Sequence, residues 1–169
     1  MTIETRFIEM VAQHQGILLK LSSIYASDKP GRKDLMQEIL FQLWKSFPKY
    51  DANRGVKIST WIYRVALNTA LTYKRNIRRV VVTEDLLKYE NTSEMQVDQV
   101  EPDEQRELLY TTIAQLEEID RAIILLSLEG YNYEDIAEIT GFNENNIGVK
   151  LNRIKKKIQS LIQDKQHGL

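Results

Sequence analysis

The chain has 169 residues, 43% of them hydrophobic and 28% charged, which suits one mid-sized or two small globular domains. It contains no cysteine, so disulfides and thiolate metal sites are excluded and the reducing cytoplasm is the expected location. No apolar run approaches the roughly 18 residues that a membrane span requires, and the N-terminus shows no secretory signal pattern. Only 7 glycines and 3 prolines punctuate the sequence, which favours long helices over many strands. We therefore expect an all-α protein that does not insert into a membrane.

The net charge of −1 hides an uneven distribution of charge along the chain. Residues 1–82 carry 14 basic and 6 acidic groups, residues 83–104 carry 1 and 8, and residues 105–169 carry 8 and 10. Residues 89–103 are also polar and without hydrophobic periodicity. This pattern predicts two small helical domains joined by a flexible acidic linker over residues 83–104.

Hydrophobic residues at spacings of three and four predict one helix over residues 2–25 and a second over residues 32–47. Between them, Pro30 and Gly31 predict a break in the chain at residues 27–31. The expected core face of the second helix consists of Leu35, Met36, Ile39, Leu40, Leu43 and Phe47.

A different line along the second helix contains Asp34, Gln37, Phe41 and Trp44. Two large aromatic side chains beside polar groups are typical of a protein-binding surface. The alternative is that Phe41 and Trp44 pack beneath the first helix, and the sequence leaves both interpretations open.

Residues 52–83 contain no acidic residue and seven lysines or arginines. Within the helix expected over residues 58–77, one stripe spans about 80° at 100° per residue. It comprises Lys57, Trp61, Arg64, Asn68, Thr72, Arg75 and Arg79. This combination suits a nucleic-acid strand. The cations can neutralise phosphate, the amide can hydrogen-bond a base edge, and the aromatic ring can stack on a base. The alternative is an ordinary basic surface with Trp61 buried.

The C-terminal third predicts four helices, beginning with one over residues 108–116 and one over residues 121–128 that Gly130 ends. Asn132 is a candidate cap for the third helix, and Gly141 supplies a tight, left-handed turn after it. Asn143 is a candidate cap for the fourth helix. Helix, glycine turn and helix over residues 133–147 is the helix-turn-helix pattern of DNA-binding proteins.

The fourth helix has one apolar stripe, formed by Ile147, Leu151, Ile154, Ile158 and Leu161. The opposite side carries Asn145, Val149, Asn152 and Lys156, flanked by Arg153 and Lys155. No acidic residue lies between Asn145 and Gln163, although solvated helix faces usually mix charge signs. Asparagine and arginine read base edges, valine meets a thymine methyl and lysine holds phosphate, so this face predicts DNA recognition. The alternative is a solvated helix with a basic end.

Other chemistry is not indicated by the sequence. The two histidines, His14 and His167, lie at opposite ends of the chain, and no phosphate-binding glycine motif or nucleophile motif is present. We therefore expect no metal, no cofactor and no enzymatic activity.

With these segments in place, the whole chain resembles the bacterial extracytoplasmic-function sigma factors. Residues 34–40 and 43–44 are similar to the polymerase-binding helix of that family, and residues 61–70 and 73–75 to its promoter-melting and −10-reading helix. Residues 116–121, 133–137 and 149–153 are similar to its −35-reading domain. Two departures are Glu117, where the family often has proline, and Lys150, where an apolar residue is common.

The resemblance implies a region 2-like domain over residues 1–82, the acidic linker over residues 83–104 and a region 4-like domain over residues 105–169. The implied contacts with core RNA polymerase are Asp34, Gln37, Glu38, Phe41 and Trp44. The implied contacts with −10 DNA are Lys57, Trp61, Arg64, Asn68, Thr72, Lys74, Arg75, Arg78 and Arg79. The implied contacts with −35 DNA are Asn145, Asn146, Val149, Lys150, Asn152, Arg153, Lys155 and Lys156.

The resemblance also implies that Asn68 and the loop of residues 51–57 accept a base flipped from the non-template strand. The implied partners are core RNA polymerase, promoter DNA and an anti-sigma factor, and no cofactor is required. One alternative is a helix-turn-helix regulator that binds DNA without polymerase. Another is an enzyme that acts on nucleic acid, against which the missing metal-ligand cluster counts.

Overall fold

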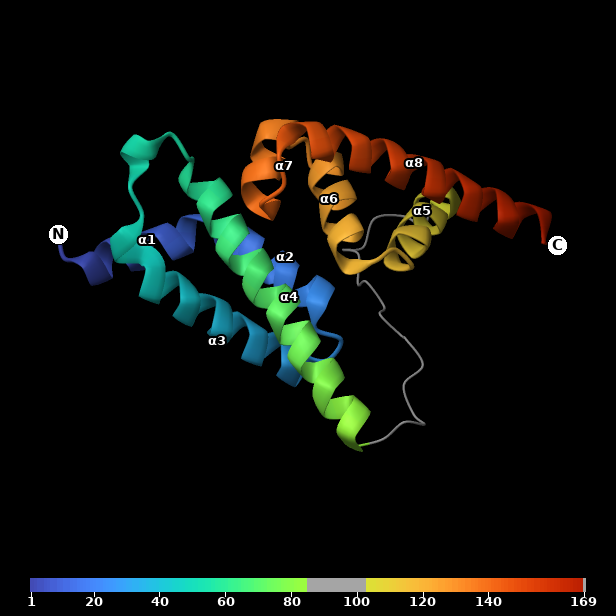
Figure 1. Ribbon diagram of the computed structural model, residues 1–169. Helices are drawn as coiled ribbons and strands as arrows, with labels where there is room; N and C mark the ends of the chain where they lie inside the picture. The colour runs from blue at the N-terminus through green and yellow to red at the C-terminus, as the bar shows by residue number, and fades with distance from the viewer. Residues whose placement is uncertain (85–102, 169) are drawn as a thin grey trace. The chain divides into compact units, whose positions relative to one another are not determined.

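A computed structural model describes residues 1–84 and 103–168, with side chains described through residue 77 in the first range (Figure 1). These residues form two compact units, one in each range. Every regular element in the described ranges is an α-helix or a short 3-10 helix, so the all-α prediction is confirmed. None of the described helices is both long enough and apolar enough to cross a membrane.

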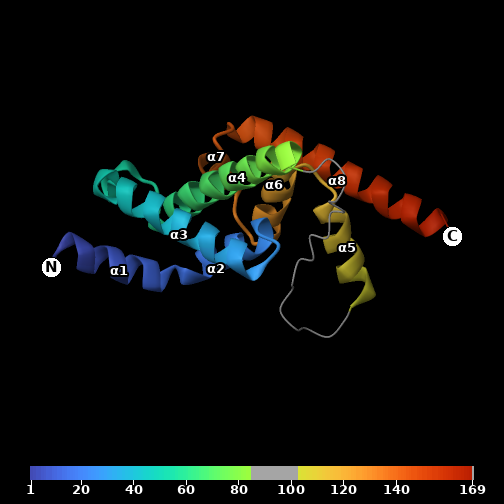
Figure 2. The ribbon, with the colours of Figure 1, turned by 90° about the horizontal axis from the view of Figure 1, so that it is seen from below.

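The first unit is built on three helices that pack against one another pairwise. It contains α1 (Ile3–Gln13), α2 (Gln15–Tyr25), α3 (Lys29–Ser46), the 3-10 helices η1 (Phe47–Lys49) and η2 (Ala52–Arg54), and α4 (Ile58–Glu84). Helices α2, α3 and α4 contact one another, and α3 runs antiparallel to α4 (Figures 1 and 2). Their shared core comprises Leu18, Leu21, Leu35, Ile39, Leu43, Ile62, Ala66, Leu67 and Ala70.

The single helix expected over residues 2–25 is wrong, because the chain breaks at His14. The backbone N–H of His14 is divided between the carbonyls of Met10 and Val11, each at 3.2 Å. The His14 ring nitrogen Nδ1 also lies 2.9 Å from the carbonyl oxygen of Met10. The backbone at His14 has φ −116° and ψ 18°, which is not helical, and α2 starts from it. A competing local hydrogen bond of this kind is invisible to hydrophobic periodicity.

Helix α3 begins three residues earlier than the sequence predicted. Asp28 is its N-cap, and the carboxylate oxygen Oδ1 accepts a 2.8 Å hydrogen bond from the N–H of Gly31. Pro30 sits in the first turn, where its missing N–H and fixed φ cost nothing. The Tyr73 hydroxyl of α4 donates to the carbonyl of Gly31 at 3.3 Å, and burial first, then Asp34 and Asp28, raise the pKa of Tyr73. This hydrogen bond fastens the start of α3 to α4.

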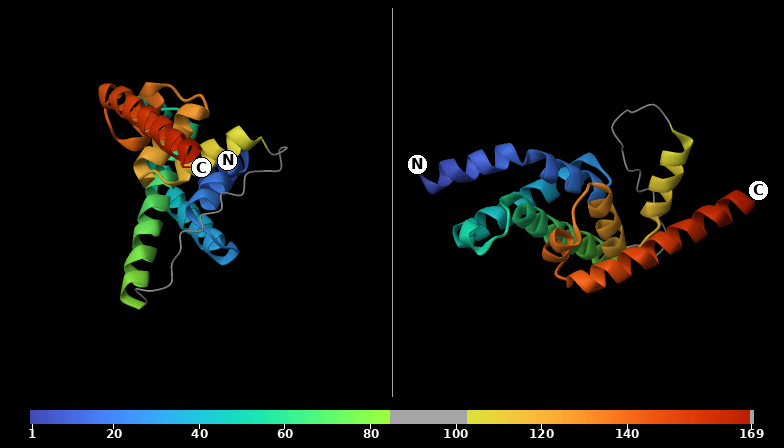
Figure 3. Two further views of the ribbon diagram at one scale, coloured as in Figure 1. Left: turned by 90° about the vertical axis from the view of Figure 1, so that its right-hand side faces the viewer. Right: turned by 90° about the horizontal axis from the view of Figure 1, so that it is seen from above.

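The second unit contains α5 (Glu104–Ala114), α6 (Glu118–Leu128), α7 (Tyr133–Thr140) and α8 (Glu144–His167). Helix α8 is the long element of this unit, with α7 packed at its start and α5 along it (Figure 3). The most deeply buried residues are Ile113, Ile123, Leu126, Ile136, Ile139, Ile147 and Leu151. The four expected helices are confirmed, except that Leu116 lies in the turn after α5.

A buried arginine fixes the turn between α5 and α6. Only 6% of Arg121 is exposed, and its Nη2 donates to the carbonyls of Ala114, at 2.6 Å, and Leu116, at 3.3 Å. These carbonyls belong to the end of α5 and the turn after it, where the helix itself supplies no partner. The guanidinium of Arg121, a residue of α6, therefore caps the C-terminal end of α5.

Most of the acidic segment predicted as a linker lies outside the described residues. Thr83 and Glu84 still belong to α4, and Asp103 caps α5 by accepting a 3.1 Å hydrogen bond from the N–H of Gln105.

Candidate nucleic-acid interface

The turn between α7 and α8 has the geometry that the sequence predicted. Gly141 has φ 85° and ψ 3°, a left-handed conformation that favours glycine, and its N–H bonds the carbonyl of Ala137 at 2.8 Å. Asn143 caps α8, its Oδ1 accepting from the N–H of Asn146 at 2.8 Å. Asn132 caps α7 in the same way, its Oδ1 accepting a hydrogen bond from the N–H of Asp135 at 2.8 Å. Three local signals therefore place α8 directly after α7 in a helix-turn-helix.

Helix α8 has one buried face and one exposed face. Ile147, Leu151, Ile154 and Ile158 are buried, and Leu161 is half-buried. Exposed on the rest of its surface are Asn145, Asn146, Val149, Asn152, Arg153, Lys155 and Lys156. Val149 is 51% exposed although it is apolar, as a contact to a thymine methyl requires.

Lys150 differs from the other predicted −35 residues. It is half-buried, and its ammonium nitrogen lies 4.7 Å from the centre of the Phe142 ring. This cation–π contact holds the lysine over the aromatic side chain at the helix-turn-helix corner. The position therefore serves packing as well as charge, which explains how a lysine can occupy a site where an apolar residue is common.

The stripe on α4 forms a polar, cationic ridge in the structure. Exposed along it are Lys57, Arg64, Asn68, Thr72 and Arg75. The side chains of Arg78 and Arg79 lie outside the described residues. Lys74 is half-buried, with its ammonium 6.0 Å from the Tyr25 ring, so it faces α2 rather than the ridge.

Trp61, at the head of the ridge, is half-buried rather than fully buried or free. Its ring centre is 5.1 Å from that of Tyr50 and 6.4 Å from that of Phe47. The Tyr50 hydroxyl in turn donates to the carbonyl of Val56 at 2.8 Å. Tyr50 therefore anchors the loop before α4 to Trp61, whose ring remains partly exposed.

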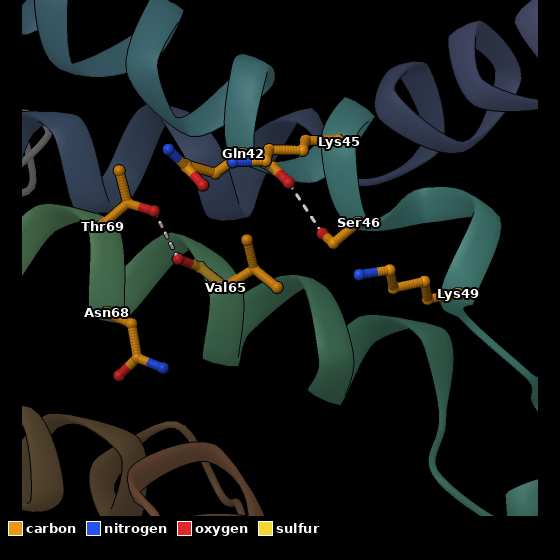
Figure 4. Close-up of a pocket in the computed structure, with 7 residues that line it drawn as sticks. All are labelled: Gln42, Lys45, Ser46, Lys49, Val65, Asn68 and Thr69. Atoms are coloured by element: carbon orange, nitrogen blue, oxygen red, sulfur yellow. Dashed lines mark hydrogen bonds between the residues drawn. The ribbon is translucent and has the colours of Figure 1, made fainter.

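A cavity of about 320 Å³ lies beside the ridge, between α3 and α4 (Figure 4). Its lining residues are Gln42, Lys45, Ser46, Lys49, Val65, Asn68 and Thr69. No acidic residue lines it, and two ammonium groups do. The hydroxyls of Ser46 and Thr69 donate to the carbonyls of Gln42 and Val65, each at 2.7 Å, so each hydroxyl can offer a further partner only its oxygen as an acceptor.

Asn68, one of the residues expected to accept a flipped base, lines this cavity, whereas residues 51–57 are not among its lining residues. The other lining residues were not predicted, because they come together only where α3 meets α4. The available signal was the polar series Gln42, Ser46 and Lys49, which recurs at spacings of four and three along the end of α3 and into η1.

The two aromatic residues of the predicted protein-binding surface on α3 differ in their surroundings. Phe41 is 56% exposed, whereas Trp44 is 39% exposed and packs edge-to-face on Phe7 of α1 with ring centres 5.1 Å apart. Asp34, Gln37 and Glu38 are exposed beside them. Glu38 also accepts from the amide of Gln42 at 3.0 Å, which links this surface to the cavity wall.

Among the described residues, no group of three or more histidine, aspartate or glutamate side chains gathers closely enough to bind a metal ion. A helix-turn-helix whose second helix carries no acidic residue from Asn145 to Gln163, together with a cationic helical surface on α4, is typical of a DNA-binding protein. Comparison with known proteins identifies the family to which this DNA-binding protein belongs. Residues 10–80 match the model of Sigma-70 region 2, and residues 106–158 match that of Sigma-70, region 4.

Full-length relatives agree with these matches. The chain is 30% identical to the ECF RNA polymerase sigma-E factor of Haemophilus influenzae, over 91% of this chain and 86% of that one. It is 27% identical to the ECF RNA polymerase sigma factor SigM of Bacillus subtilis, over 79% and 81% of the two chains. The chain belongs to the extracytoplasmic-function sigma factors, and is an alternative sigma factor that directs transcription initiation.

Solved structures share the fold. The sigma factor RpoE from Bartonella quintana, in complex with the anti-sigma factor NepR, matches with a TM-score of 0.67 and 21% identity over 95% of this chain and 96% of that one. CnrH, in complex with the cytosolic domain of CnrY, matches with a TM-score of 0.63 and 16% identity over 95% and 89%.

Proposed function

We propose that this sigma factor acts in the cytoplasm, holding the −10 element with the first unit and the −35 element with the second. Residues 1–82 would form the first part, residues 83–104 the linker and residues 105–169 the second part. The observation that carries the proposal is the cavity beside the α4 ridge, which is lined by two lysines and by no acidic residue. Its two ammonium groups and exposed amide suit one unpaired base and its phosphate, whereas α8 presents a convex face for an intact groove.

On the first unit, Lys57, Arg64, Thr72 and Arg75 would follow the phosphates of the non-template strand. Asn68 would bond the edge of a flipped base inside the cavity, and Trp61 would stack against a neighbouring base. Binding energy released by these contacts would open the duplex, so no covalent step and no cofactor is required.

On the second unit, α8 would enter the major groove. Asn145, Asn152 and Arg153 would read base edges there, with Val149 against a methyl group. Lys155 and Lys156 would hold phosphates and set the register without reading sequence.

The exposed α3 surface of Asp34, Gln37, Glu38, Phe41 and Trp44 would bind core RNA polymerase. Because the matched structure of RpoE is a complex with the anti-sigma factor NepR, an anti-sigma protein is a further proposed partner. Phe41 is the better test of the surface, since Trp44 also supports α1 through Phe7.

The deciding experiment combines a pull-down on core RNA polymerase with run-off transcription. We expect Phe41→Ala with Gln37→Ala to weaken core binding by about 30-fold, the loss of one interface hot spot. Glu9→Ala, on the exposed side of α1, is the control and should bind core as the wild type does. A wild-type protein that neither binds core nor directs initiation would favour a regulator that acts without polymerase.

A further inference from the structure

Gly148 lies inside α8, where glycine is a poor helix former. The positive-φ glycines in the described residues are Gly55, Gly130 and Gly141, so the backbone of Gly148 does not require glycine. A methyl group at its Cβ position would lie 3.4 Å from the ring of Tyr133, an ordinary van der Waals contact. The second unit therefore has both the room and the backbone conformation for alanine at this position, and its own packing does not explain the glycine.

The position of Gly148 on α8 suggests another explanation. Gly148, Asn152 and Lys155 follow one another at spacings of four and three, so they share one flank of the helix. This flank borders α7, because Tyr133, the first residue of α7, lies over Gly148 and is still 49% exposed. In a helix-turn-helix the second helix enters the major groove while the first crosses the sugar–phosphate backbone. The DNA strand that α7 crosses therefore passes the flank of Gly148.

We propose that Gly148 is a positioning residue for the −35 element, because its missing side chain lets the α8 backbone approach one DNA strand. The Tyr133 ring forms one wall of this approach, and Lys155 meets the phosphates further along the same flank. The inference rests on the proposed placement of α8 in the major groove. A methyl group at residue 148 would hold α8 away from that strand and weaken the contacts of Asn152 and its neighbours together.

The test is Gly148→Ala in the full chain, assembled with core RNA polymerase on promoter DNA selected with the wild-type holoenzyme. We expect the melting temperature of the second unit to rise by about 2–5 °C, because alanine restricts the unfolded chain and favours the helix. We expect affinity for the −35 element to fall about tenfold, as one poorly matched base pair would cause. Opposite signs for stability and affinity separate positioning from a purely structural role.

Gly16→Ala is the matched control. Gly16 lies in α2 with no atom within 4 Å of its Cβ position, so alanine should raise the stability of the first unit slightly. It lies away from the proposed DNA contacts, and promoter affinity should not change.

A second pair of variants distinguishes the backbone from the tyrosine ring. If Gly148→Ala still lowers affinity when introduced into Tyr133→Ala, close approach of α8 is supported. If the loss disappears in that background, displacement of the ring caused it and the inference is overturned. A lowered melting temperature in Gly148→Ala would also overturn it, since the fold would then need the glycine.

Failure of the inference can be told from failure of the proposed function. If Gly148→Ala binds normally while Asn152→Ala loses −35 preference, α8 reads the groove but residue 148 has no part in its approach. If the wild-type holoenzyme shows no dependence on the −35 sequence, both the placement of α8 and the inference are wrong.

Discussion

The ridge along α4 and the exposed arc of α8 from Asn145 to Lys156 are both cationic and lack acidic residues, yet the two surfaces have different shapes. Helix α4 packs against α2 and α3, and its ridge borders a cavity with Lys49 and Asn68 in its lining. Helix α8 buries one face on the second unit and exposes a convex arc from Asn145 to Lys156. A cavity suits a single unpaired base, and a convex arc suits the groove of an intact duplex. Similar compositions are therefore proposed to bind two different states of DNA.

The cores that support these surfaces also differ, and the largest expected effect tests that difference. The first unit is stabilised by apolar contacts, whereas the second also depends on the buried guanidinium of Arg121. We expect Arg121→Ala to lower the free energy of unfolding of the second unit by about 3 kcal/mol, because two carbonyls lose their donor and a cavity remains.

Spectroscopy can assign this loss to one unit, since both tryptophans, Trp44 and Trp61, belong to the first. In urea titrations of Arg121→Ala, far-ultraviolet circular dichroism should show an earlier transition while tryptophan fluorescence is unchanged. Arg106→Ala is the control, because Arg106 is exposed on α5 and contacts only one face of Tyr110 among the interactions observed. A shift in both signals would mean that the units do not unfold independently.

What could be predicted from sequence follows the range of the interactions involved. Asn132, Gly141 and Asn143 each form a hydrogen bond with a residue three or four positions away. The helix-turn-helix, including its capping residues, could therefore be predicted from the sequence. The exposed and buried faces of α8 followed from periodicity for the same reason. The capping role of Arg121 and the His14 break were not predicted, since each depends on a particular side-chain hydrogen bond.

The cavity shows the same limit at longer range. Asn68 was predicted as a base-binding residue from its place on the α4 stripe. The partners of Asn68 on α3, including Lys45 and Lys49, depend on how two helices cross, which no local pattern specifies. The family resemblance implied the loop of residues 51–57 as well. Tyr50, beside this loop, anchors it against Trp61, and the role of the loop in base binding stays a prediction.

The next prediction concerns the single-stranded side of the comparison. We expect Asn68→Ala to lower affinity for the non-template strand of the −10 element about tenfold, because one base loses its edge contacts in the cavity. The holoenzyme's binding to single-stranded oligonucleotides that differ at one position measures both affinity and base preference. Asn76→Ala, exposed on α4 but outside the cavity lining, should have little effect. Equal losses in both variants would argue that α4 is only a basic surface.

The duplex side is tested by Arg153→Ala. We expect about a fivefold loss of preference for the −35 sequence, at the lower end of what one base pair contributes, because Arg153 lies at the flank of the exposed arc. Binding to the single-stranded −10 oligonucleotide should stay as in the wild type. A loss on the single strand instead would contradict the assignment of α8 to duplex DNA.

The smallest effect is expected for Lys156→Ala, which removes a charge that neutralises phosphate without reading a base. The slope of log K against log salt should become shallower by about 0.9 for duplex −35 DNA, while sequence preference is retained. Lys157 provides the matched control, because it is also exposed but points about 100° away from Lys156 around α8. Titrations of both variants between low and physiological salt decide between two interpretations. If Lys157→Ala changes the slope as much as Lys156→Ala, the basic end of α8 acts as a diffuse charge, and the directional contact proposed for Lys156 is wrong.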